Sequence, residues 1–233
     1  MESSLRVATE YRGCLICHML DKDEYDFMAQ LQYQTIKKEK VRQDVVSANG
    51  YCNFHFHQMA RLASPVGNAV LTKDLIDAEI KEFERDSFGP TLRIDCPVCR
   101  HTEKREDFYL EEFKALLKER SFQKEYEGTD GLCSLHFRNI LNSTDEKELC
   151  QFLLTTQVMH LKSLRMELET FISKVRSTSR DIGVEKNSWL IAIEKWVGKR
   201  GLRIRPPPPR RSPVSHKGEI RLVNVQLLSD RPR

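Results

Sequence analysis

The sequence reads CLIC at residues 14–17 and CNFH at 52–55, and the pattern returns as CPVC at 96–99 and CSLH at 133–136. The second copy follows the first at a nearly constant offset, because CxxC recurs from position 14 to position 96 and CxxH from position 52 to position 133. Six of the seven cysteines fall in this repeated frame. Thiolate and imidazole groups at these spacings are typical of metal ligands, so the repeat predicts two metal sites with three cysteines and one histidine each.

We expect each copy of the pattern to complete its own site. The first site would take Cys14, Cys17, Cys52 and His55, and the second would take Cys96, Cys99, Cys133 and His136. Residues 18–51 separate the CxxC and CxxH pairs in the first copy, and residues 100–132 separate them in the second. Either segment is long enough for one or two helices that lead away from the CxxC pair and bring the chain back to it. Each metal ion would then connect the two ends of the helical segment between the CxxC and CxxH pairs of one copy.

The repeat extends beyond the ligands. Gly131 in the second copy takes the place of Gly50 in the first, and Tyr109 takes the place of Phe27. Apolar residues at helical spacing surround these positions, and Ser64-Pro65 is typical of a helix N-terminus. The pattern therefore predicts an all-α fold made of a duplicated helical module, each half closed by a Cys3His site, with a long helix after the second site.

The expected organisation has four parts. Residues 1–90 form the first module, 91–178 the second module with the long helix, 179–200 a C-terminal amphipathic helix, and 201–233 a tail. The tail contains four consecutive prolines and many arginines, and we expect it to be disordered. Residues 199–233 carry a net charge of +8 within a chain of net charge +4, so the preceding body is mildly acidic.

Composition limits the class of protein. Apolar residues make up 39% and charged residues 31%, and no run of 18 apolar residues occurs, so we expect no membrane span. The N-terminal residues lack the apolar core of a secretory signal. Cysteines in such a chain are expected to stay reduced, and the expected location is the cytoplasm.

Zinc is the metal that these ligands favour, with two Zn²⁺ ions per chain in closed structural sites. An iron–sulfur cluster is less favoured because such clusters take mostly cysteine ligands. A thioredoxin-like CxxC would need a βαβ context that the sequence does not predict. A catalytic zinc needs an open coordination position, whereas each predicted set already has four ligands.

Other residues have simpler interpretations. His18 and His101, just after each CxxC, are expected at helix starts in solvent rather than as ligands. Cys150 has no counterpart in the other copy, and we expect it to be a small buried thiol. Acidic pairs such as Asp23/Glu24 are expected on solvated helix faces. Trp189 and Trp196 share one face of a helix, which predicts core packing.

The stretches CLICHMLDKDEYDF, GYCNFHFHQMARLASPVGNAV, CPVCR and GLCSLHF are similar to a prokaryotic family of uncharacterised proteins with twin CxxC…CxxH motifs, a domain of unknown function. The resemblance covers about residues 10–200. It implies a mostly helical, metal-binding cytoplasmic protein, and it brings no known activity or substrate.

The sequence thus favours a zinc-stabilised helical binding or scaffold protein with an unknown protein partner, and it contains no recognisable catalytic motif. One alternative is a nucleic-acid-associated regulator that binds through the basic residues of Lys199–Arg233. Another is a thiol or metal redox sensor, or an iron–sulfur protein.

Overall fold

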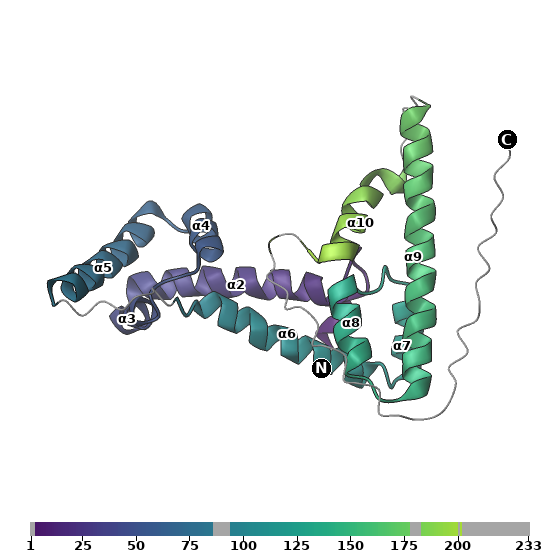
Figure 1. Cartoon of the computed structure of the whole chain (residues 1–233), viewed down its shortest axis with the longest axis horizontal. Coiled ribbons are helices and arrows are strands. Elements are labelled where there is room, and N and C mark those ends of the chain that lie inside the picture. The colour runs from purple at the N-terminus through teal and green to yellow at the C-terminus, as the bar shows by residue number, and fades with distance from the viewer. Residues whose placement is uncertain (1–2, 86–93, 178–182, 200, 202–233) are drawn as a thin grey trace.

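The computed structural model describes residues 3–85, 94–177, 183–199 and 201, and every regular element in these ranges is a helix (Figure 1). The helices are α1 (Ser4–Ala8), α2 (Leu15–Lys37), α3 (Glu39–Ser47), α4 (Asn53–Leu62), α5 (Pro65–Glu84), α6 (Pro97–Leu116), α7 (Arg120–Glu127), α8 (Ser134–Asn142), α9 (Lys147–Arg176), the 3₁₀ turn η1 (Val184–Asn187) and α10 (Ser188–Val197). The predicted all-α class is confirmed.

The duplication is equally clear in the helix order. Helices α2, α3, α4 and α5 correspond in sequence order to α6, α7, α8 and α9, and the four starts are displaced by nearly the same offset as the motifs. The predicted start of α5 is also correct: Pro65 is its first residue, and the Ser64 hydroxyl accepts a hydrogen bond from the Gly67 N–H at 3.0 Å. Helices α2–α5 and helices α6–α9 are therefore two copies of one helical unit.

Helices α2 and α6 lie side by side and run in opposite directions through the middle of the molecule (Figure 1). The Phe27 ring in the second half of α2 stacks on His101 near the start of α6, with 4.0 Å between ring centroids. Further along α6, the Tyr109 hydroxyl donates a hydrogen bond to Asp23 at 2.8 Å. Because the pair is antiparallel, each helix begins toward the end of the other.

Two hydrophobic cores form at the two ends of this pair. One core joins α1 and the first turns of α2 to the end of α6 and to α7, α8 and α9, with Phe113 and Tyr126 completely buried in it. The other joins the rest of α2 to α3, α4 and α5, and it includes Cys96 and Val98 from the start of α6. Each core thus draws residues from both copies, across the boundary expected near residue 90.

Two expectations about the C-terminal region have different outcomes. Trp189 and Trp196 on α10 are 46% and 72% exposed, so the prediction that they pack in the core is wrong. The buried residues of this helix are instead Ser188 and the long side chain of Lys195. The tail predicted from residue 201 lies outside the described residues except for Gly201. Within the described ranges, no helix is both long and apolar enough to cross a bilayer.

Candidate metal centres

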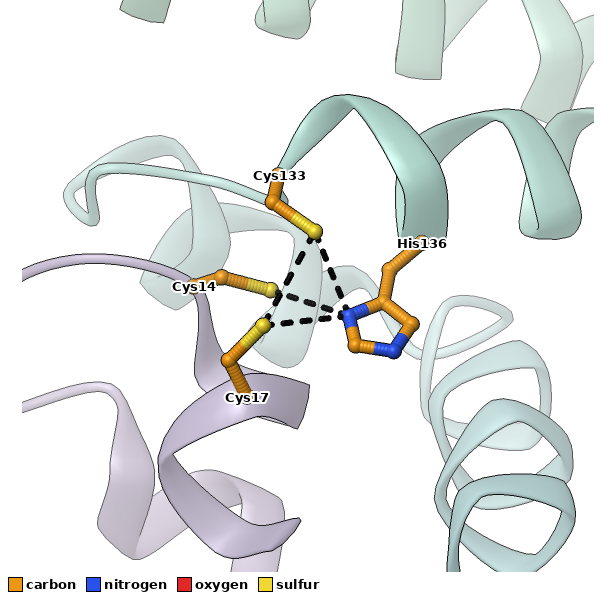
Figure 2. Close-up of side chains that lie close together, drawn as sticks. All are labelled: Cys14, Cys17, Cys133 and His136. Carbon is orange, nitrogen blue, oxygen red and sulfur yellow. Dashed lines mark hydrogen bonds between the residues drawn. The ribbon is translucent and has the colours of Figure 1, made fainter. Parts of the chain in front are cut away.

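The first cluster, called site A, brings together Cys14, Cys17, Cys133 and His136 (Figure 2). Each of the three sulfurs lies 3.4 Å from Nδ1 of His136, and the sulfurs of Cys17 and Cys133 are 3.8 Å apart. All four residues are buried. Four potential ligand atoms therefore surround a small common centre.

The second cluster, called site B, brings together Cys52, His55, Cys96 and Cys99. The sulfurs lie 3.2 to 3.4 Å from Nδ1 of His55, and those of Cys52 and Cys99 are 3.7 Å apart. His55 and Cys96 are buried, whereas Cys52 and Cys99 are partly exposed. Sites A and B have the same ligand types and nearly the same interatomic distances.

The eight residues predicted as ligands are those that meet in the structure, but the predicted partners within each set are wrong. The CxxC pair of each copy joins the CxxH pair of the other copy. The cause is the unequal length of the helices between the two motifs. In the first copy α2 runs 23 residues outward, about 34 Å, and α3 returns only 9 residues, about 13 Å. His55 of the CxxH pair is therefore left beside Glu24, near the middle of α2, where it meets Cys96 and Cys99 at the start of α6.

Helix N-termini at both sites stabilise the thiolate form of the cysteines. The first cysteine of each motif is the N-cap residue of the helix that follows, namely Cys14 for α2, Cys52 for α4, Cys96 for α6 and Cys133 for α8. A helix N-terminus carries a partial positive charge and unpaired N–H groups, which stabilise an adjacent thiolate. Two helix N-termini thus converge on each site.

A glutamate carboxylate faces Nε2 of each histidine, the ring nitrogen that points away from the cysteine sulfurs. Nε2 of His55 lies 3.4 Å from Glu24 Oε2, and Nε2 of His136 lies 3.4 Å from Glu106 Oε1. Both carboxylates are almost fully buried, and Glu24 also accepts a hydrogen bond from the Thr102 hydroxyl at 3.0 Å. A carboxylate facing Nε2 keeps the proton on that nitrogen and leaves Nδ1 as the ligand atom.

These glutamates were missed from the sequence, where Glu24 was predicted to lie on a solvated face. A signal was nevertheless present, because each glutamate stands seven residues after the second cysteine of its CxxC pair. Glu24 and Glu106 thus occupy the same place in the two copies. The repeat therefore includes a carboxylate as well as the four candidate ligands.

Without a cation, the charges within site B favour one thiolate, at Cys96, and a protonated imidazole, at His55. Burial would raise the pKa of Cys96, but hydrogen bonds with His55 and with the backbone of Cys52 and Cys99 lower it to about 6. Burial would lower the pKa of His55, but hydrogen bonds with Cys96 and Glu24 raise it to about 10. The cluster thus pairs a thiolate with an imidazolium, and a bound cation would take the place of that proton.

Site A shows the same pattern in a more buried setting. Burial acts to raise the pKa of Cys14, but hydrogen bonds with Cys133 and Cys17 and the charge of His136 lower it well below its ordinary value. Lys195 of α10 is also buried beside this site, and its ammonium donates to the Asp130 carbonyl oxygen. Its positive charge offsets the negative charge of the thiolates.

The remaining predicted residues lie outside the clusters. His18 stacks on Tyr11 and His101 stacks on Phe27, each with 4.0 Å between ring centroids, so both are packing residues rather than ligands. Cys150 is partly exposed rather than buried, and its thiol donates to the Thr144 carbonyl oxygen at 3.2 Å. The seven cysteines, all within the described ranges, form no disulfide.

Comparison with known proteins agrees with the duplicated architecture. One family model, described as a family of unknown function (DUF6062), matches the chain twice, over residues 6–91 and 87–200. Neither the curated proteins nor the solved structures gave a match. Each match spans one CxxC…CxxH copy and its helices, and together they cover most of the chain. The protein therefore belongs to the family of unknown function DUF6062 and carries two copies of its unit.

Proposed function

We propose that this protein is a zinc-stabilised helical binding or scaffold protein, in which two structural Cys3His zinc ions fasten the two copies to each other. The observation that carries the proposal is the convergence of six cysteines and two histidines into two four-ligand clusters. Each ion would bind ligands from both copies, so metal binding and assembly of the two halves would be one event.

The interatomic distances support zinc. Zinc–sulfur bonds of about 2.3 Å place two sulfurs of a tetrahedron about 3.8 Å apart, and the sulfur pairs here are 3.7 and 3.8 Å apart. Bonds of that length and a zinc–nitrogen bond of about 2.0 Å give a sulfur–nitrogen edge of about 3.5 Å, against 3.2 to 3.4 Å in the two sites. The ligand atoms therefore already lie near the corners of a zinc tetrahedron.

The same distances argue against a multi-iron cluster. In such a cluster the ligands bind different irons, so ligand atoms on opposite sides lie far apart. Here all four ligand atoms of each site lie within 4.8 Å of one another, which suits a single ion. Four protein ligands also fill a tetrahedron, as they do in structural rather than catalytic zinc sites.

The binding part of the proposal rests on exposed apolar side chains. Helix α10 presents Trp189, Ile193 and Trp196 to solvent, and all three are at least 46% exposed. Tryptophan is enriched in the buried centres of protein–protein interfaces. A helix held in place by a metal-fastened body and bearing such a face suits attachment of a partner protein.

Metal analysis of the purified full chain tests the zinc proposal. We expect about two zinc equivalents per chain, and about one after Cys14→Ser/Cys17→Ser, which removes site A alone. The Cys150→Ser variant is the matched control, because Cys150 lies outside both clusters, and it should keep two equivalents. An iron chromophore, or a helical protein without metal, would contradict the proposal.

A further inference from the structure

Sites A and B differ in their access to solvent. In site A the four ligand residues are between 0% and 6% exposed. In site B, His55 and Cys96 are 0% and 4% exposed, but Cys52 and Cys99 are both partly exposed. A small solute can therefore reach site B without the fold opening, whereas site A requires local unfolding first.

The difference follows from where each site lies relative to its core. Site A is inside the larger core, where Cys14, Cys17 and Cys133 are themselves core residues and α10 lies against α8 and α9. In site B only Cys96 among the cysteines belongs to the core, while Cys52 and Cys99 pack against its edge. Site B thus has one side toward the protein and one toward water.

The two partly exposed cysteines of site B are also neighbours. Their sulfurs are 3.7 Å apart, and they come from different copies, Cys52 at the N-cap of α4 and Cys99 in the first turn of α6. A disulfide bond is about 2.05 Å long, so the sulfurs need to approach by only about 1.7 Å. Cys17 and Cys133 in site A have nearly the same separation, 3.8 Å, but both are buried.

We propose that Cys52 and Cys99 form a thiol-oxidation site, at which a hydroperoxide converts the two thiolates to a disulfide and releases the metal ion of site B while site A keeps its own. This inference rests on the proposed function, because it requires a metal ion in site B. It gives the two sites different roles: the ion of site A stabilises the fold and is kept during oxidation, whereas site B loses its ion when hydroperoxide oxidises its cysteines.

The chemistry balances with hydrogen peroxide as the oxidant. One thiolate attacks a peroxide oxygen and breaks the O–O bond, which gives a sulfenic acid and, after protonation, one water. The second thiolate attacks the sulfenic sulfur, the S–S bond forms, and the departing hydroxide is protonated to a second water. The two thiolates lose two electrons to the peroxide. Only His55 and Cys96 would then remain as ligands at site B, so a divalent ion held there would be released without a change of oxidation state.

The test uses the full chain with Cys150→Ser, which removes the one thiol outside the clusters. Metal content is measured first, and the protein is then treated with a few equivalents of hydrogen peroxide while a colorimetric chelator records zinc release. Remaining thiols are alkylated after denaturation, and non-reducing peptide mapping by mass spectrometry identifies the disulfides. The Cys17/Cys133 pair is the internal control, since it matches Cys52/Cys99 in separation and differs in burial.

We expect one zinc equivalent to be released, roughly tenfold or more faster than the second, together with a Cys52–Cys99 disulfide and alkylated Cys17 and Cys133. Release of both equivalents at one rate, a dominant Cys17–Cys133 or Cys96–Cys99 disulfide, or no reaction would overturn the inference. These failures differ from failure of the proposed function, which would already appear as fewer than two zinc equivalents before peroxide is added.

Discussion

The sulfur of Cys17 lies 3.8 Å from the sulfur of Cys133, although 116 residues separate them in the chain. Cys17 belongs to the first copy and Cys133 to the second. The contact means that a metal ion in site A would crosslink the two copies, and site B repeats the arrangement in the opposite sense. Each copy therefore contributes its CxxC pair to one site and its CxxH pair to the other, so both sites connect the two halves.

Exchange of ligands can be tested by combining substitutions. Cys17→Ser alone should lower the zinc content from about two equivalents to about one, because it removes a ligand of site A. Cys17→Ser/Cys133→Ser should also leave about one, since both residues serve the same site, whereas Cys17→Ser/Cys52→Ser should leave almost none. Metal analysis with helicity measured by circular dichroism provides the readout. Pairing within each copy would produce the reverse result for the two double variants.

The glutamates behind the histidines should control metal affinity. Glu106→Gln removes the charge beside His136 Nε2, so we expect zinc affinity at site A to fall by about 10- to 100-fold. Glu24→Gln should do the same at site B. Competition with a chromogenic chelator measures both effects. Glu103→Gln on the exposed face of α6 is the control and should leave affinity unchanged; an equal loss there would show a general charge effect instead.

Removal of metal should unfold much of the protein. A structural zinc site contributes roughly 10 kcal/mol or more to folding at neutral pH, and each ion here would join helices of both copies. A strong chelator should therefore reduce the helical signal, and added zinc should restore it. Retention of full helicity after complete metal removal would show that the cores suffice without the ions.

Gly131 should tolerate no side chain. Its φ is +74°, and a Cβ atom would clash with Nδ1 of the buried His160, so Gly131→Ala should cost more than about 1 kcal/mol of unfolding free energy. Gly128 is the matched control, three residues earlier with a φ of −80° and its nearest contact at 3.4 Å. Gly128→Ala should be nearly neutral. Denaturant unfolding of the two variants makes the comparison.

The loss of stability on truncating an aromatic side chain should depend on its burial and not on its size. Phe113 is completely buried between Phe122 and Tyr126, so Phe113→Ala should destabilise the protein by about 3–5 kcal/mol. Trp196 is 72% exposed, and Trp196→Ala should change stability by no more than about 0.5 kcal/mol. Chemical denaturation gives both values. A large loss with Trp196→Ala would indicate that this side chain is covered in solution, for example by a partner copy.

Local chemistry in the sequence was sufficient to predict the all-α class, the start of α5 and the candidate ligand residues. Ser64-Pro65 begins α5 as predicted, because an N-cap hydroxyl followed by proline acts within a single turn. The duplication was equally visible, since it is a property of spacing alone. The exposure of Trp189 and Trp196 was not predictable in this way, because a helical stripe is the same whether it faces a core or solvent.

The sequence by itself determined that this protein is a duplicated all-helical chain with eight candidate metal-ligating side chains, since these features depend on residue type and spacing along the chain. Only the tertiary structure decided which four of these side chains meet. The spacing between the motifs permits either pairing, and the choice comes from the antiparallel packing of α2 and α6. These long helices start at opposite ends of their shared interface, so each carries its CxxC pair away from its own CxxH pair and into the other half.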